Sequence, residues 1–226
     1  MAEVSDSEVR DFIITSIAAI HGLLLAFLII VVWEKYSSLR ESVAMEAGAI
    51  MNVARGTKLL PPADRIRVLD ELAAYTHEVI DDDWPKLREA GHQDTKGLMK
   101  ASQTLSKLWA EVGKYEFSII SENMMGNLDS VSKERVRRFA IAREGVPVPL
   151  WAALAVGTMA TIIFAVFRHQ EALDIKNIFM FAWFAVFLVA MLWILIDLDY
   201  PFGGTQNIEP TPFEHAIRVI EAQRAK

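Results

Sequence analysis

His21 stands inside a long apolar stretch, where an ionisable side chain is unusual. A titratable group within a membrane segment is by default a candidate functional residue, and an imidazole that meets a neighbouring helix or an aqueous path can titrate near neutrality. A neutral histidine that is hydrogen-bonded inside a helix bundle fits the same position equally well. The sequence leaves both interpretations open.

The sequence offers few other groups for chemistry. Asp81, Asp82 and Asp83 form an acidic run that could attract cations, although such a run at a helix end is more often a solvated surface. The five histidines are scattered without a metal-ligand spacing, and the chain has no cysteine. It also has no phosphate loop, dinucleotide fingerprint or nucleophile elbow. We therefore expect no metal, no cofactor and no enzymatic activity.

Three apolar segments, residues 12–33, 150–167 and 178–196, are long enough as helices to cross a hydrocarbon core of about 30 Å. They predict an all-α integral membrane protein. The first could be a signal peptide, but the leader of a signal peptide is basic. Here that leader is acidic, and we expect the segment to be retained.

Basic residues near the membrane predict the orientation, because they concentrate on the cytoplasmic side. We expect the amino terminus outside and both a helical domain at 34–149 and a tail at 197–226 in the cytoplasm, so that the chain divides into 1–33, 34–149, 150–196 and 197–226. The net charge of −6 leaves no basic stripe for nucleic acid. The basic residues used are Lys35, Arg40, Arg135, Arg137, Arg138 and Arg143.

Helical patterning continues past residue 33 as far as Pro61 and Pro62, so the first membrane helix is predicted to extend beyond the membrane as one rod. Pro85 should end or kink the next helix, and Gly145 and Pro147 should end the last one. These further helices are predicted at about 64–80, 96–125 and 132–144.

The tail contains the sequence Thr211-Pro212-Phe213-Glu214. Thr211 is expected to cap a short helix, with Pro212 at its first position and Glu214 reaching back to the cap.

Small residues form one face of the first membrane helix, at Gly22 and Ala26, and recur in the second at Gly157. Because lipid supplies no hydrophobic drive between helices, close approach through small residues is a main source of their association. These residues predict helix contacts, within one subunit or between subunits.

Another side of the first helix is bulky and apolar. In a pore it would form a hydrophobic constriction, whereas the pattern by itself favours contact with lipid. Its residues are Ser16, Ile20, Leu23, Leu24, Phe27 and Val31.

Several short motifs follow one another along most of the chain. They are Leu23-Leu24-Leu25-Ala26-Phe27, Trp33-Glu34-Lys35-Tyr36, Glu46-Ala47-Gly48-Ala49-Ile50, Leu60-Pro61 and Asp199-Tyr200-Pro201-Phe202-Gly203-Gly204. In this order they resemble the bestrophin-like domain family of bacterial and plant membrane proteins.

The resemblance implies an oligomeric ion channel, mostly for anions, with an apolar membrane helix lining its neck. It also implies a post-membrane motif comprising Asp197, Asp199, Pro201, Phe202 and Gly203. Two features depart from bestrophins. The segment 204–209 holds one carboxylate where animal bestrophins have an acidic calcium clasp, and three spans replace four.

The leading hypothesis is a homo-oligomeric channel, a pentamer or tetramer, in a bacterial-type inner membrane, with the bulky face of the first helix around a path for inorganic ions. At the pore mouth Lys35 and Arg40 would favour anions, whereas Glu34 and Glu46 would favour cations. The alternative is a membrane-anchored helical scaffold that docks a partner.

Overall fold

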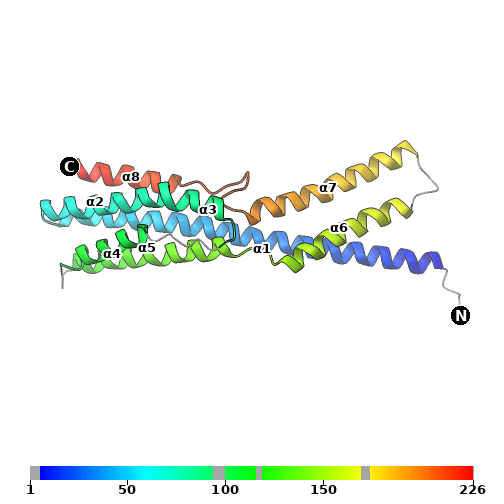
Figure 1. The fold of residues 1–226 in the computed structure, drawn as a ribbon, viewed down its shortest axis with the longest axis horizontal. Coiled ribbons are helices and arrows are strands. Elements are labelled where there is room, and N and C mark those ends of the chain that lie inside the picture. Colours follow the sequence, from blue (N-terminus) through cyan, green and yellow to red (C-terminus); the bar gives the residue numbers. More distant parts are fainter. Residues whose placement is uncertain (1–5, 94–99, 116–118, 169–173, 226) are drawn as a thin grey trace. The chain divides into compact units, whose positions relative to one another are not determined.

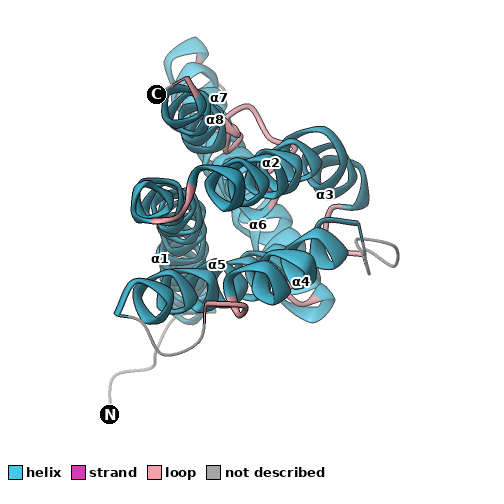
Figure 2. Ribbon diagram, turned by 90° about the vertical axis from the view of Figure 1, so that its left-hand side faces the viewer, coloured by secondary structure: helices cyan, strands magenta, loops and turns pink. Residues whose placement is uncertain are grey.

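The computed structural model describes residues 6–93, 100–115, 119–168 and 174–225 (Figure 1). Within these ranges the regular structure is helical throughout, without strands (Figure 2). The chain forms two compact units, one of residues 1–34 and 146–199 and the other of residues 35–145 and 200–226. The helices are α1 (Asp6–Gly56), α2 (Pro62–Glu78), α3 (Trp84–Ala90), α4 (Lys100–Val112), α5 (Ile119–Arg143), α6 (Val148–Arg168), α7 (Ile175–Asp199) and α8 (Thr211–Arg224), with a 3-10 turn at Thr57–Leu59 and a π-helix at Val79–Asp83.

The first unit contains the apolar part of α1 together with α6 and α7, and each of these helices is long and apolar enough to cross a membrane. One side of α1 is buried at three- and four-residue steps, at His21, Leu25, Leu28 and Val32. On α7 most side chains are exposed although they are apolar. Such a surface requires lipid or a partner, and the chain is an integral membrane protein.

The second unit is a bundle in which α2 packs on α4 and α8, and α4 packs on α5 (Figure 2). The second half of α1 belongs to the same unit. Its buried residues recur at three- and four-residue steps, which is the pattern of a helix with one face against a core. The core of this unit includes Leu39, Val43, Ile50, Leu69, Leu72, Leu108, Leu128 and Phe213.

The predicted rod is present, since α1 runs without a break from Asp6 to Gly56. The prediction of one helix at 96–125 was wrong. A turn follows α4, in which the amide of Gly113 donates to Trp109 and that of Tyr115 donates to Val112, and a new helix begins at Ile119. The helix predicted separately at 132–144 is the second half of α5, which ends before Gly145 as expected.

The interruption expected near Pro85 is present. Helix α2 ends at Glu78, the π-helix Val79–Asp83 follows it, and Pro85 lies in the first turn of α3. The capping prediction for the tail was wrong. Pro210 occupies the cap position of α8, and no side chain caps this helix. The hydroxyl of Thr211 instead donates to Glu209 at 3.4 Å, so the expected capping box does not form.

Candidate functional site

One face of α1 is left uncovered by the described residues of the first unit. Ile20 is 68% exposed, Leu23 is 74%, Phe27 is 61% and Val31 is 42%, whereas Ser16 and Leu24 are half-buried. We call these six residues the neck face. At 3.6 residues per turn its centre lies about 120° around the helix from the buried face. The packing of the first unit therefore leaves the neck face free to meet water, lipid or another subunit.

A third side of α1 carries the small residues Gly22 and Ala26, which are both exposed. A Cβ placed on Gly22 would meet no other atom within 4 Å. This side lies about 120° from both the neck face and the buried face. Gly22 and Ala26 thus make no close helix contact with the described residues of this chain, and contact with a neighbouring subunit remains a proposal.

Gly157 is different, because it lies directly against α1. A Cβ at this position would come within 2.4 Å of His21 Nδ1 and 2.9 Å of its Cγ. Thr158 is the next residue of α6, and its Oγ1 lies 3.1 Å from His21 Nε2. The imidazole is therefore seated on α6 inside the first unit, and it is 5% exposed.

The four residues expected at a pore mouth separate into two groups. Glu34 and Arg40 are exposed, and Lys35 is half-buried. Glu46 is completely buried inside the helical unit. It therefore presents no carboxylate to an aqueous path in this subunit, contrary to the expected placement, because its own fold supplies partners that neutralise it.

Glu46 belongs to a buried cluster of charges. Arg138 donates to it from Nε at 2.9 Å and from Nη2 at 3.2 Å, and the Tyr75 hydroxyl donates at 2.7 Å. Arg138 Nη2 also lies 3.5 Å from Asp83, which pairs in addition with Arg135. The two carboxylates balance the two guanidinium groups, so the cluster is neutral overall.

Burial shapes the protonation of this cluster. The pKa of Tyr75 is raised well above its usual value, chiefly by burial away from water and secondly by the negative charge of Glu46. The phenol therefore stays protonated and donates its hydrogen bond. Burial also raises the pKa of Asp83, although Arg138 and Arg135 oppose that shift. For Arg138, burial is the largest single influence and works against the charge, but Glu46, Asp83 and Tyr75 together outweigh it and raise the pKa.

This cluster was not predicted from the sequence. Asp83 was expected in a solvated acidic run, whereas the structure buries it at the end of the π-helix. The other two carboxylates of the run do lie at the surface, since Asp81 is exposed and Asp82 is half-buried beside Lys86. One signal was available: Glu46 recurs at helical spacing with the apolar Val43 and Ile50.

Aromatic rings connect the cluster to the segment after α7. The guanidinium of Arg138 lies 5.2 Å from the ring centre of Trp84, a separation at which cation–π attraction operates. Trp84 in turn packs edge-on against Phe202 with centroids 5.3 Å apart, and its Nε1 donates to the Ile208 carbonyl at 3.0 Å. Trp84 thus joins a buried charge to the post-membrane motif.

The post-membrane motif is divided between the two units. In the first unit Asp199 is buried, and both its oxygens lie 3.3 Å from the amide of Val146, while Asp197 is half-buried. In the second unit Pro201 and Phe202 are buried and Gly203 is exposed. None of these carboxylates belongs to a group of three or more metal-ligand side chains, and the described residues contain no such group.

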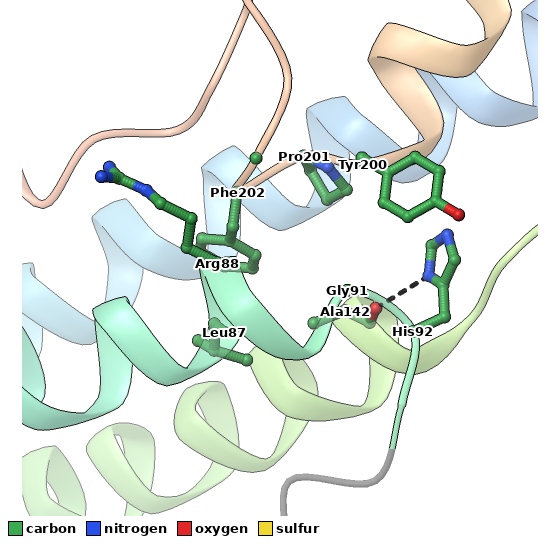
Figure 3. Close-up of a pocket in the computed structure, with 9 residues that line it drawn as sticks. Leu87, Arg88, Gly91, His92, Ala142, Tyr200, Pro201 and Phe202 are labelled. Carbon is green, nitrogen blue, oxygen red and sulfur yellow. Dashed lines mark hydrogen bonds between the residues drawn. The ribbon is translucent and has the colours of Figure 1, made fainter.

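A small pocket adjoins the second part of the motif (Figure 3). Tyr200 and His92 stack there with ring centres 4.7 Å apart, and His92 Nδ1 lies 3.2 Å from the Ala142 carbonyl. Gly91 allows this approach, because its φ of 55° is in the left-handed region and a Cβ would lie 3.2 Å from the Tyr200 ring.

Comparison with known proteins gives a family and a fold. Residues 2–213 match the family model described as the Bestrophin-like domain. Two mutants of a bacterial bestrophin homolog from Klebsiella pneumoniae superimpose with TM-scores of 0.79 and 0.78, each at 12% identity, over 94% and 100% of this chain and 87% and 90% of theirs. A search of curated proteins found no match. The resemblance seen in the sequence is confirmed, as is an all-helical fold of this type.

Proposed function

The chain belongs to the bestrophin-like domain family, and from this premise we propose that it forms a homo-oligomeric ion channel. In this proposal the neck faces of several α1 helices surround an axial path. The described part of one subunit contains three mostly apolar spans, which cannot enclose a wetted path by themselves. Conduction therefore requires assembly, as a pentamer or tetramer with closed symmetry.

The observation that carries the proposal is the exposure of the neck face. The apolar part of α1 uses a different side, containing Leu25 and Leu28, for its buried contacts within the subunit. The side with Gly22 and Ala26 would allow a close approach to a neighbouring subunit. The bulky neck face then meets the axis, where apolar side chains can gate ions by wetting and drying.

We further propose that the channel conducts anions. Burial of Glu46 removes one carboxylate from the expected pore mouth. This leaves Lys35 and Arg40 against Glu34 and Glu41, which are both exposed on this part of α1, so the remaining charges balance. The proposal of anion conduction therefore rests on the family resemblance, and the charges of this stretch by themselves favour neither sign.

The proposed orientation places the amino terminus outside and the helical unit in the cytoplasm of a cell with an inner membrane. Arg135 and Arg138 no longer support it, because they are buried in ion pairs. Arg137, Arg143 and Arg40 are exposed and still do. A protease-accessible tag beside Lys100 should be protected in sealed cells and cleaved after lysis, and cleavage in sealed cells would reverse the orientation.

Planar-bilayer recording of the purified full chain tests conduction. Phe27→Ala should alter unitary conductance or open probability, because it widens the proposed constriction. Phe187→Ala on α7 is the matched control, since Phe187 is also apolar and 56% exposed. We expect it to behave like the native chain. If neither the native chain nor Phe27→Ala shows conductance at any salt or voltage while the oligomer is intact, the channel proposal fails and the anchored scaffold takes its place.

A further inference from the structure

His21 meets α6 through both sides of its ring. Nε2 is within hydrogen-bond distance of the Thr158 hydroxyl, at 3.1 Å. Nδ1 occupies the place that a Cβ on residue 157 would need, at 2.4 Å, so only glycine admits the ring there. Nδ1 itself has no hydrogen-bond partner among the described residues. The imidazole therefore lies closely against α6, with one ring nitrogen facing the Thr158 hydroxyl.

The rest of the same buried face of α1 is apolar, at Leu25, Leu28 and Val32. Apolar contacts between helices in lipid have little directional preference, because lipid tails are as apolar as the side chains. A hydrogen bond is directional, and a polar group that loses its partner in the hydrocarbon region is penalised. The pair of His21 and Thr158 is thus the directional part of this contact.

Rotation of α1 also determines which side chains face away from α6. Successive residues of a helix differ by about 100°, so the position of His21 dictates the directions of Leu23 and Phe27. We propose that His21 is a positioning residue that holds α1 against α6 in the rotation that presents the neck face to the channel axis. This role rests on the proposed function, because it assigns the axis to that face.

Without the hydrogen bond, α1 can turn on α6 toward orientations that present neighbouring positions. Ile30 is suited to report this rotation, because it is 57% exposed and flanks the neck face on the side of Gly22 and Ala26. The prediction is that Ile30 gains contact with water while Phe27 and Val31 lose it, because Val31 lies about 100° around the helix from Ile30.

The native chain has no cysteine, so single cysteines can report the rotation without background. Phe27→Cys, Val31→Cys and Ile30→Cys are treated in the oligomer with a charged, water-soluble methanethiosulfonate, and labelling is followed by intact mass. With His21 present, the first two should react and Ile30→Cys should not. In a His21→Asn background, the labelling rates of the first two should fall by about tenfold, the change expected from loss of one hydrogen bond, and that of Ile30→Cys should rise.

A matched pair of substitutions separates positioning from bulk structure. The amide nitrogen of His21→Gln is as many bonds from Cα as Nε2, so it can reach Thr158 and should restore the native pattern. The amide of His21→Asn is shorter and should not. Thr158→Val and Thr158→Ser form the same pair from α6, and they keep the test available should a His21 variant fail to assemble.

The outcomes are distinct. Absence of labelling at Phe27→Cys and Val31→Cys with His21 present would overturn the proposed neck, and with it this role. Native labelling that is unchanged by His21→Asn and Thr158→Val would overturn the role of His21 alone. Equal disruption by His21→Asn and His21→Gln would also overturn it, since the hydrogen bond would then make no difference.

Discussion

Arg138 on α5 and Glu46 on α1 form a two-point ion pair in the interior of the helical unit, with both side chains fully buried. The two residues are 92 positions apart in the chain, so the pair ties the extended part of α1 to α5. A complete buried pair adds little net stability, but removal of one partner leaves a charge that water no longer solvates.

Arg138→Met should therefore destabilise the full chain by about 3–5 kcal/mol, because Glu46 and Asp83 lose a shared cation. Thermal unfolding in detergent, followed by circular dichroism, would measure this. Arg137→Met is the control, since Arg137 is the exposed neighbour, and it should unfold close to the native temperature. Equal shifts for both variants would mean that the buried pair has no special role.

Trp84 should contribute through its ring more than through its N–H. Trp84→Phe loses the hydrogen bond to Ile208, at a cost of about 0.5–1.5 kcal/mol. Trp84→Ala also loses the contacts with Phe202 and Arg138, at a cost of about 3–5 kcal/mol. Denaturant unfolding of both variants checks the order, and a phenylalanine variant as unstable as the alanine variant would contradict it.

Gly91 should tolerate no side chain. Gly91→Ala forces a left-handed conformation and crowds the Tyr200 ring, with an expected loss of about 1–3 kcal/mol. Gly126 within α5 provides the opposite case, because a Cβ there meets nothing within 4 Å. Gly126→Ala should gain up to about 1 kcal/mol from helix propensity. Melting curves that rank the two variants in the reverse order would refute this assignment.

Charge at the proposed mouth should control selectivity. Arg40→Glu changes an exposed cation into an anion in every subunit, and the ratio of anion to cation permeability should fall by about tenfold or more. Reversal potentials in a salt gradient measure this ratio. Arg218→Glu on α8 makes the same charge change on an exposed helix of the tail and should leave the ratio unchanged. Identical reversal potentials for the native chain and Arg40→Glu would remove Arg40 from the conduction path.

The three spans and the long first helix could be predicted because each depends on local sequence. A run of about 20 apolar residues forms a span wherever it occurs, and Gly145 and Pro147 end α5 by backbone restriction alone. The prediction of a single helix at 96–125 was wrong because it depended on a local signal that is weak. A short turn at Gly113 gives a weak local signal within an otherwise helical pattern.

Partnerships between distant residues were decided by the tertiary structure. His21 was open to two interpretations until Thr158, 137 residues away, was placed beside it, and Glu46 was assigned to a pore mouth until Arg138 was found against it. Sequence alone determined which segments are helical and apolar, since those properties follow from side chains a few residues apart. Which charges are buried and which face of α1 stays open depends on the packing of helices far apart in the chain, and only the folded structure decides that.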